Sequence, residues 1–135
     1  MKKVNFKYEV FNPNPYHVKG QKAKNGDCVI RAICKASGLD WFKVYDMLCA
    51  RGREVGDFGN NRTVYPSVIE DLGFKPVSVK RDAGKKAMTV ERFIDEHPTG
   101  VYILRLAHHL TCVVDGVCYD TWYPQRMTIY KYWTK

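Results

Sequence analysis

The sequence predicts a compact α+β fold in which N-terminal helices pack on an antiparallel β-sheet, and two features of the chain indicate it. Segments with helical periodicity and capping residues fill residues 28–72, and segments rich in β-branched and aromatic residues follow, with one short helix among them. Helices first and strands second favour α+β over a sheet whose strands alternate with helices. With 135 residues the chain has the length of one ordinary domain, which we expect to span residues 1–135.

The helical half is defined by signals at the helix ends. A helix is expected at Cys28–Ser37, because Asp27 can cap its start and Gly38 follows its last turn. Apolar residues cover most of the circumference of this helix, which is typical of a helix at the centre of a core. Asp40 can cap a second helix at Trp41–Arg51. The other segments expected here are a loop at Gly52–Asn61 and helices at Thr63–Leu72 and Thr89–Glu96.

The clearest local signal in the strand half is a hairpin. Leu110–Val114 and Val117–Tyr119 are two β-rich runs, and the Asp115-Gly116 pair between them favours a two-residue turn. Asn-Pro pairs favour turns after the first strand, so residues 1–25 are expected to form a strand followed by an irregular basic arm. The other strands are expected at Val4–Val10, Phe74–Lys80, Val101–Leu106 and Met127–Trp133.

Composition and cysteine usage argue against several classes of protein. A hydrophobic fraction of 45% disfavours a disordered chain. No segment approaches the ~18 apolar residues of a membrane span, and the basic N-terminus lacks the apolar stretch of a secretion signal, so we expect no membrane association. The 5 cysteines are an odd number, which favours free thiols in a reducing, cytoplasmic setting over a disulfide scaffold.

The net charge of +8 has two explanations. It arises from 22 Lys and Arg residues against 14 Asp and Glu residues. Because the basic residues are scattered, a solubilising surface is the simpler explanation. The alternative is affinity for an acidic partner, and nucleic acid is the less favoured form of that partner.

Cys28 is the cysteine best placed for chemistry. It follows Asp27 directly and therefore occupies the first turn of the expected apolar helix. The helix dipole and the free backbone N–H groups at that position favour a thiolate, and the same N–H groups can bind an oxyanion. The other cysteines lie inside expected helices or strands: Cys34, Cys49, Cys112 and Cys118.

Hairpin geometry selects a base and an orienting group for such a nucleophile. If the Asp115-Gly116 turn has two residues, alternation along the strands places His109 and Asp120 on the same face, on neighbouring residue pairs. Such diagonal neighbours are about 7–8 Å apart at the backbone, within reach of an imidazole–carboxylate hydrogen bond. His108 then falls on the opposite face. A nucleophilic cysteine needs a base, and the base needs a group that orients it.

Each of these signals also has an ordinary structural explanation. A cysteine at a helix start is commonly inert, and Asp120 can be a simple strand cap. No cysteine pair has the C-x-x-C spacing of a zinc site, and Cys112 and Cys118 are expected on opposite faces of the hairpin, so we expect no metal. The chain also lacks a glycine-rich phosphate loop, and we expect no cofactor.

The chain resembles papain-like cysteine peptidases. The order is the same: a Cys at the start of the central helix (NGDCVIRAI), a His opening a late strand (HHLTCVVDG), and Asp-Thr-Trp closing the next strand (YDTW). The resemblance implies Cys28 as nucleophile, His109 as base, Asp120 as orienting group and Trp122 as a shield of the His–Asp contact. Bacteriocin-processing peptidases of the same fold look similar. The chain resembles more closely a group of small phage and bacterial proteins with a similar hairpin and a Tyr-x-Tyr-Trp tail.

The resemblance leaves the oxyanion donor open. Papain-like enzymes use a Gln that precedes the Cys, but here Lys22 stands at that spacing and Gln21 lies one residue further away. Asn25 is a second candidate donor. The backbone N–H of Cys28 is a third candidate, and it does not depend on spacing.

Together these observations predict a compact papain-like domain that acts as a thiol protease or amidase on a peptide or protein, in the host cytoplasm if a phage encodes it. Two alternatives remain open at this point. One is an acyl-transfer or deamidase activity that uses the same three residues. The other is a basic module that binds nucleic acid or a host protein on the same fold without catalysis.

Overall fold

Six strands form one sheet, and four helices pack against it in the part of the chain that the structure describes. The structure is a computed structural model that describes residues 7–19, 21, 26–81, 84 and 86–135. The helices are α1 (Cys28–Ser37), α2 (Trp41–Val55), α3 (Tyr65–Asp71) and α4 (Val90–Glu96). The strands are β1 (Tyr8–Val10), β2 (Lys75–Ser78), β3 (Val101–Leu106), β4 (His109–Val114), β5 (Val117–Asp120) and β6 (Lys131–Thr134).

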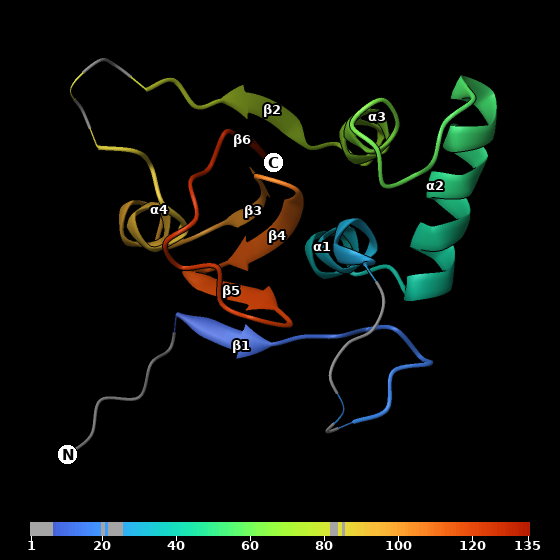
Figure 1. Ribbon diagram of the computed structural model, residues 1–135, viewed down its shortest axis with the longest axis horizontal. Helices are drawn as coiled ribbons and strands as arrows, with labels where there is room; N and C mark the ends of the chain where they lie inside the picture. Colours follow the sequence, from blue (N-terminus) through green and yellow to red (C-terminus); the bar gives the residue numbers. More distant parts are fainter. Residues whose placement is uncertain (1–6, 20, 22–25, 82–83, 85) are drawn as a thin grey trace.

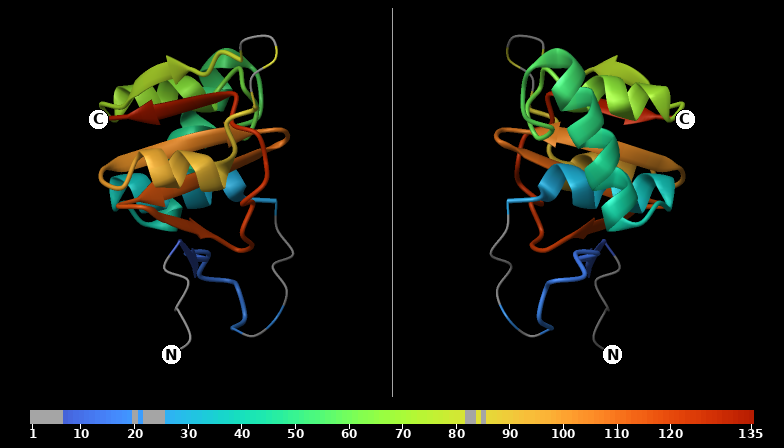
Figure 2. Two further views of the ribbon diagram at one scale, coloured as in Figure 1. Left: turned by 90° about the vertical axis from the view of Figure 1, so that its left-hand side faces the viewer. Right: turned by 90° about the vertical axis from the view of Figure 1, so that its right-hand side faces the viewer.

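The elements form layers, with the sheet between helices on both sides. The strand order across the sheet is β1-β5-β4-β3-β6-β2. Helices α1, α2 and α3 lie on one side of the sheet and α4 lies on the other, while α1 occupies the space between the sheet and α2 (Figures 1 and 2). The expected α+β class is therefore confirmed. None of the helices in the described residues has the length and apolarity that crossing a membrane requires.

Two apolar clusters hold these layers together. The larger one lies between the sheet and α1–α3, and it is built around the buried side chains of Ile33, Ile103 and Trp133. The smaller one lies under α4 and includes Phe93 and Leu104. Because α1 contributes to the larger cluster over most of its surface, its position along the sheet is fixed by packing, as its apolar circumference predicts.

The expectation of a purely antiparallel sheet is wrong at one edge. Strand β1 pairs with β5 in parallel, with Tyr8 opposite Cys118 and Val10 opposite Asp120, so the sheet is mixed. No hairpin joins these two strands, which lie far apart in the sequence, so no local turn dictates their relative direction. The start of the expected strand Val4–Val10 lies largely outside the described residues.

Two expected boundaries also move. The closing strand begins at Lys131 rather than Met127, because the preceding segment pairs with the residues that lead into α4, with Ile129 N–H donating to the Met88 carbonyl. Helix α2 continues through Gly52 to Val55, where a loop was expected. The predicted caps at Asp40 and Gly38 are present, since the Asp40 carboxylate accepts from the Lys43 N–H and Gly38 is left-handed.

Gly52 links the end of α2 to the loop that follows. A side chain at this position would clash with the Asp57 carbonyl oxygen, so the loop can fold back only because residue 52 has no Cβ. The Asp57 carboxylate then accepts hydrogen bonds from the Phe58 N–H, the Asn61 side chain and the Thr63 hydroxyl. This folded loop carries residues 60–62 toward the sheet end where β3 meets β4.

Gly52→Ala should therefore destabilise the protein. Alanine normally stabilises a helix interior relative to glycine, by about 0.5–1 kcal/mol. Here we expect the clash with the Asp57 carbonyl to reverse the sign, with a loss of about 1–3 kcal/mol in the free energy of unfolding. Denaturant unfolding measures it, and Gly26→Ala is the control because nothing lies within 4 Å of an added Cβ there. An unchanged or raised midpoint for Gly52→Ala would contradict the account.

Candidate active site

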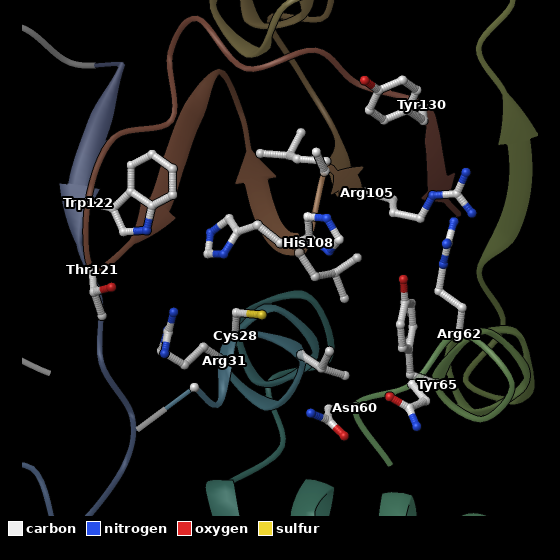
Figure 3. A pocket seen from close by; sticks show the side chains of 17 residues that line it. Cys28, Arg31, Asn60, Arg62, Tyr65, Arg105, His108, Thr121, Trp122 and Tyr130 are labelled. Carbon is white, nitrogen blue, oxygen red and sulfur yellow. The ribbon is translucent and has the colours of Figure 1, made fainter. Parts of the chain in front are cut away.

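The three residues predicted to act together meet at one end of the sheet. Cys28 begins α1, His109 begins β4 and Asp120 ends β5. They lie at an open cleft of about 800 Å³, which Cys28 and His109 line directly (Figure 3). Asp120 lies behind His109, with only 2% of its surface exposed. The packing of α1 against β4 therefore carries the thiol to the imidazole.

The hairpin has the expected register. Val114 pairs with Val117 across a two-residue turn, and Cys112 and Cys118 point to opposite apolar clusters. His109 Nε2 lies 2.6 Å from Asp120 Oδ2, so the hydrogen bond predicted from strand alternation is present. Because this bond occupies Nε2, Nδ1 is the ring nitrogen left for the interaction between His109 and Cys28.

The surroundings of Cys28 favour its thiolate. Burial opposes ionisation, but hydrogen bonds from His109 and from the Leu110 backbone N–H, with the positive charges of His109 and Arg31, outweigh it and lower the thiol pKa. The pKa values of three other cysteines are shifted in the opposite direction. Burial raises the pKa of Cys34 and Cys118 to about 12 and also raises that of Cys112.

His109 is set up as the cationic partner of this thiolate. Burial alone would favour the neutral imidazole, but hydrogen bonds to Asp120 and Cys28 and their negative charges raise the His109 pKa to about 9. The pKa of the Asp120 carboxyl is lowered. Burial alone would raise it, but the hydrogen bond and positive charge of His109, together with hydrogen bonds from Thr111 and the Thr121 N–H, outweigh burial. The lowered pKa of Cys28 and the raised pKa of His109 both favour a thiolate–imidazolium pair, which the Asp120 carboxylate orients.

Asp27 has a different role from the N-cap that the sequence predicts. It precedes α1, but its side chain makes no capping hydrogen bond. Its carboxylate turns inward instead, where it pairs with Arg31 and accepts from Trp41 Nε1 at 3.0 Å and Asn14 Nδ2 at 3.2 Å. Because this side chain caps none of them, the first backbone N–H groups of α1 remain available at the cleft.

Arg31 joins the two carboxylates of the site. It pairs with Asp27 one turn before it, and its Nη2 lies 3.5 Å from Asp120 Oδ1. Sequence reasoning did not single it out. The signal was present, since Arg31 is the charged residue on an otherwise apolar helix face and follows Asp27 at the i,i+4 spacing.

The residues predicted to support the triad do not all lie at the cleft. Trp122 lines the cleft, and its ring centroid lies 5.0 Å from that of His109. Gln21 is exposed and is not among the residues that line the cleft. Asn25 lies outside the described residues. His108 lies in the turn before β4 with a positive φ of 54° and lines the cleft, but Asp120 bonds to His109.

Among the cleft residues that were not predicted, four more carry a guanidinium or a phenol: Arg62, Tyr65, Arg105 and Tyr130. They come from the loop before α3, from α3, from β3 and from the segment before β6, so no local sequence pattern connects them. Among the described residues no cluster of three or more His, Cys, Asp or Glu side chains could hold a metal ion. Compared with protein-family models, with curated proteins and with solved structures, the chain gives no significant match.

His109→Ala should make Cys28 less reactive at neutral pH. Losing the imidazole removes a hydrogen bond and a positive charge that favour the thiolate, so the pKa of Cys28 rises and its alkylation curve moves to higher pH. Iodoacetamide labelling rates against pH, resolved by peptide mass spectrometry, measure this. Exposed Cys49 is the internal control in the same molecule. His108→Asn, which tolerates the left-handed backbone, should leave the curve in place, and a larger shift there than in His109→Ala would contradict the assignment.

Asp120→Asn and Asp120→Ala should both lower the pKa of His109 from about 9 toward its usual 6.5, because the negative charge is lost. NMR titration of the His109 ring measures it. Alanine should also cost about 1–3 kcal/mol of stability, because Arg31 and the Thr121 N–H lose an acceptor. Asparagine keeps one acceptor oxygen and should cost less. An unchanged His109 titration in both variants would remove Asp120 from the site.

Proposed function

We propose that this protein is a cysteine hydrolase, a peptidase or amidase, in which Cys28, His109 and Asp120 form the catalytic triad. The observation that carries the proposal is that Cys28 and His109 line the same open cleft while buried Asp120 holds His109 Nε2 at 2.6 Å. Inert buried cysteines have raised pKa values, as Cys34 and Cys118 do, whereas the pKa of Cys28 is lowered.

Acylation starts from the ion pair. The Cys28 thiolate attacks the carbonyl carbon of an amide bond, and the carbonyl oxygen takes the electron pair and becomes an oxyanion. The uncapped backbone N–H groups in the first turn of α1, beginning with Cys28, are the donors in reach of that oxygen. The His109 imidazolium then gives its Nδ1 proton to the amide nitrogen. The C–N bond breaks, the amine leaves, and a thioester on Cys28 remains.

Deacylation reverses these roles. Neutral His109 takes a proton from water, and the hydroxide so formed attacks the thioester carbonyl. The second oxyanion collapses, the C–S bond breaks, and the products are a carboxylic acid and the Cys28 thiolate. Asp120 keeps the imidazole in one orientation through both steps, because its Oδ2 holds Nε2 at 2.6 Å.

The papain-like arrangement is part of the proposal. A nucleophile at the start of a central helix, a histidine that opens a strand and an aspartate that ends the next strand follow the order of that family. The Trp122 ring beside His109 agrees with the same pattern. The cytoplasmic, phage-type setting and the peptide or protein substrate are extensions of this resemblance.

Acyl transfer or deamidation would use the same thioester. A transferase replaces water by an amine in the second step, and a deamidase releases ammonia from a side-chain amide in the first step. Incubating the protein and a peptide with and without an added primary amine separates these outcomes, because hydrolysis gives a free acid and transfer gives a new amide.

Cys28→Ala should abolish turnover without unfolding the protein. We expect kcat/KM on the best substrate from an internally quenched peptide library to fall by about 10³-fold or more, because the covalent route is lost. Cys49→Ala is the matched control, since Cys49 is exposed and lies away from the cleft. Turnover by Cys28→Ala at the wild-type rate would contradict the proposal, as would a substrate thioester on any other cysteine.

A further inference from the structure

The cleft is positively charged beyond the catalytic residues. Arg62 and Arg105 line it on the side away from Trp122, together with Tyr65 and Tyr130 (Figure 3). Of the described residues that line the cleft, none is an Asp or a Glu. The two carboxylates closest to the chemistry, Asp27 and Asp120, are already paired with Arg31.

Arg62 and Arg105 line the cleft and have no carboxylate partner among the described residues, a lack that they share with Arg53 and Arg126 outside the cleft. Arg31, Arg51 and Arg92 each form an ion pair with an Asp or a Glu. Among the described residues, no Asp or Glu lies within ion-pair distance of Arg62 or Arg105. Their guanidinium donors therefore face the cleft without an anion.

The fold brings these two charges together at one phenol. In Figure 3 the guanidinium groups of Arg62 and Arg105 lie next to each other, and the Tyr65 hydroxyl points toward them. Burial raises the pKa of Tyr65, and the positive charges of Arg105 and Arg62 both act against that rise, so both groups lie close to the phenol. Two neighbouring guanidinium groups repel each other, and an anion bound between them would relieve this repulsion.

The backbone at both arginines is fixed by hydrogen bonds to neighbouring segments. Arg62 belongs to the loop that Asp57 organises through Asn61 and Thr63. Arg105 lies in β3 between β4 and β6, and its carbonyl accepts the Tyr130 N–H at 2.9 Å. The backbone that carries both side chains is thus fixed before any ligand arrives, which lowers the entropic cost of binding one.

We propose that Arg62, Arg105 and the Tyr65 hydroxyl form an anion subsite that binds a carboxylate of the substrate, so that the enzyme acts on acidic peptides. The inference rests on the proposed function, because it names the substrate class of the same cleft. Guanidinium groups bind carboxylates through paired, charge-assisted hydrogen bonds. The carboxylate can belong to an Asp or Glu side chain or to a peptide C-terminus.

The test uses labelling of Cys28, which needs no turnover. The probes are maleimidopropionic acid, maleimidohexanoic acid and the primary amide of each, so that each tether length has a charged and a neutral form. The measured quantity is the ratio of acid to amide labelling rates at Cys28, with exposed Cys49 as the internal reference. We expect this ratio to be about tenfold or more higher at Cys28 for at least one tether, the effect of one charge-assisted hydrogen bond.

Variants separate the subsite from the general positive charge. Arg62→Gln and Arg105→Gln should each reduce the ratio severalfold, whereas Arg53→Gln, an exposed arginine on α2, should leave it unchanged. Thermal melting checks that the glutamine variants fold. If Arg105→Gln folds poorly, Arg105→Lys replaces it; because lysine keeps the charge, this variant should keep part of the preference for the acid probe. Equal ratios in the wild type and both glutamine variants would overturn the proposal.

Protection of Cys28 by short peptides distinguishes the two sources of the carboxylate. Three peptides of one length are compared: a neutral amidated peptide, the same peptide with one Glu, and the neutral peptide with a free C-terminus. Stronger protection by the second assigns a side-chain carboxylate, and stronger protection by the third assigns the terminal one. Equal protection by all three would overturn the subsite. If the subsite fails this test but peptides are still hydrolysed, the proposed function stands. If the protein prefers acidic probes but hydrolyses no peptide, only the subsite stands.

Discussion

A buried guanidinium between two carboxylates is the interaction on which the site depends. Arg31 pairs with Asp27 at the start of α1 and with Asp120 at the end of β5, and it is only 5% exposed. It thereby ties the helix that carries Cys28 to the hairpin that carries His109. Removing Arg31 would leave both buried carboxylates without their cation, and such a loss typically costs about 3–5 kcal/mol. The geometry of the triad and the stability of the domain are therefore coupled.

This interaction also explains why the helix start is open to a ligand. An aspartate before a helix usually caps it, but the Asp27 carboxylate is engaged by Arg31, Trp41 and Asn14. The first backbone N–H groups of α1 keep their hydrogen-bonding capacity for an oxyanion at the cleft. Chemistry that the family resemblance would assign to a glutamine side chain can thus be supplied by the backbone, and Gln21 lies exposed outside the cleft lining.

Local rules predicted the parts of the molecule that depend on neighbours in sequence. Strand alternation across a two-residue turn was enough to choose His109 over His108 and to pair it with Asp120. Contacts between remote segments were beyond such rules. The parallel pairing of β1, the inward turn of Asp27 and the meeting of Arg62 with Arg105 all depend on how whole elements pack. The papain-like relationship itself stays a proposal, because it rests on motif order rather than on a matching relative.

The central claim is that Cys28 pairs with His109 and therefore ionises at lower pH than an ordinary cysteine. The most direct measurement is the ultraviolet absorbance of the thiolate, titrated with pH in the wild type and in Cys28→Ser, with the difference taken at each pH. The account predicts that the Cys28 thiolate appears at lower pH than an ordinary cysteine thiolate, because His109, the Leu110 N–H and Arg31 lower its pKa. Buried Cys34 and Cys118 ionise only near pH 12 and do not interfere. A difference spectrum that appears only in the range of an ordinary cysteine would contradict it.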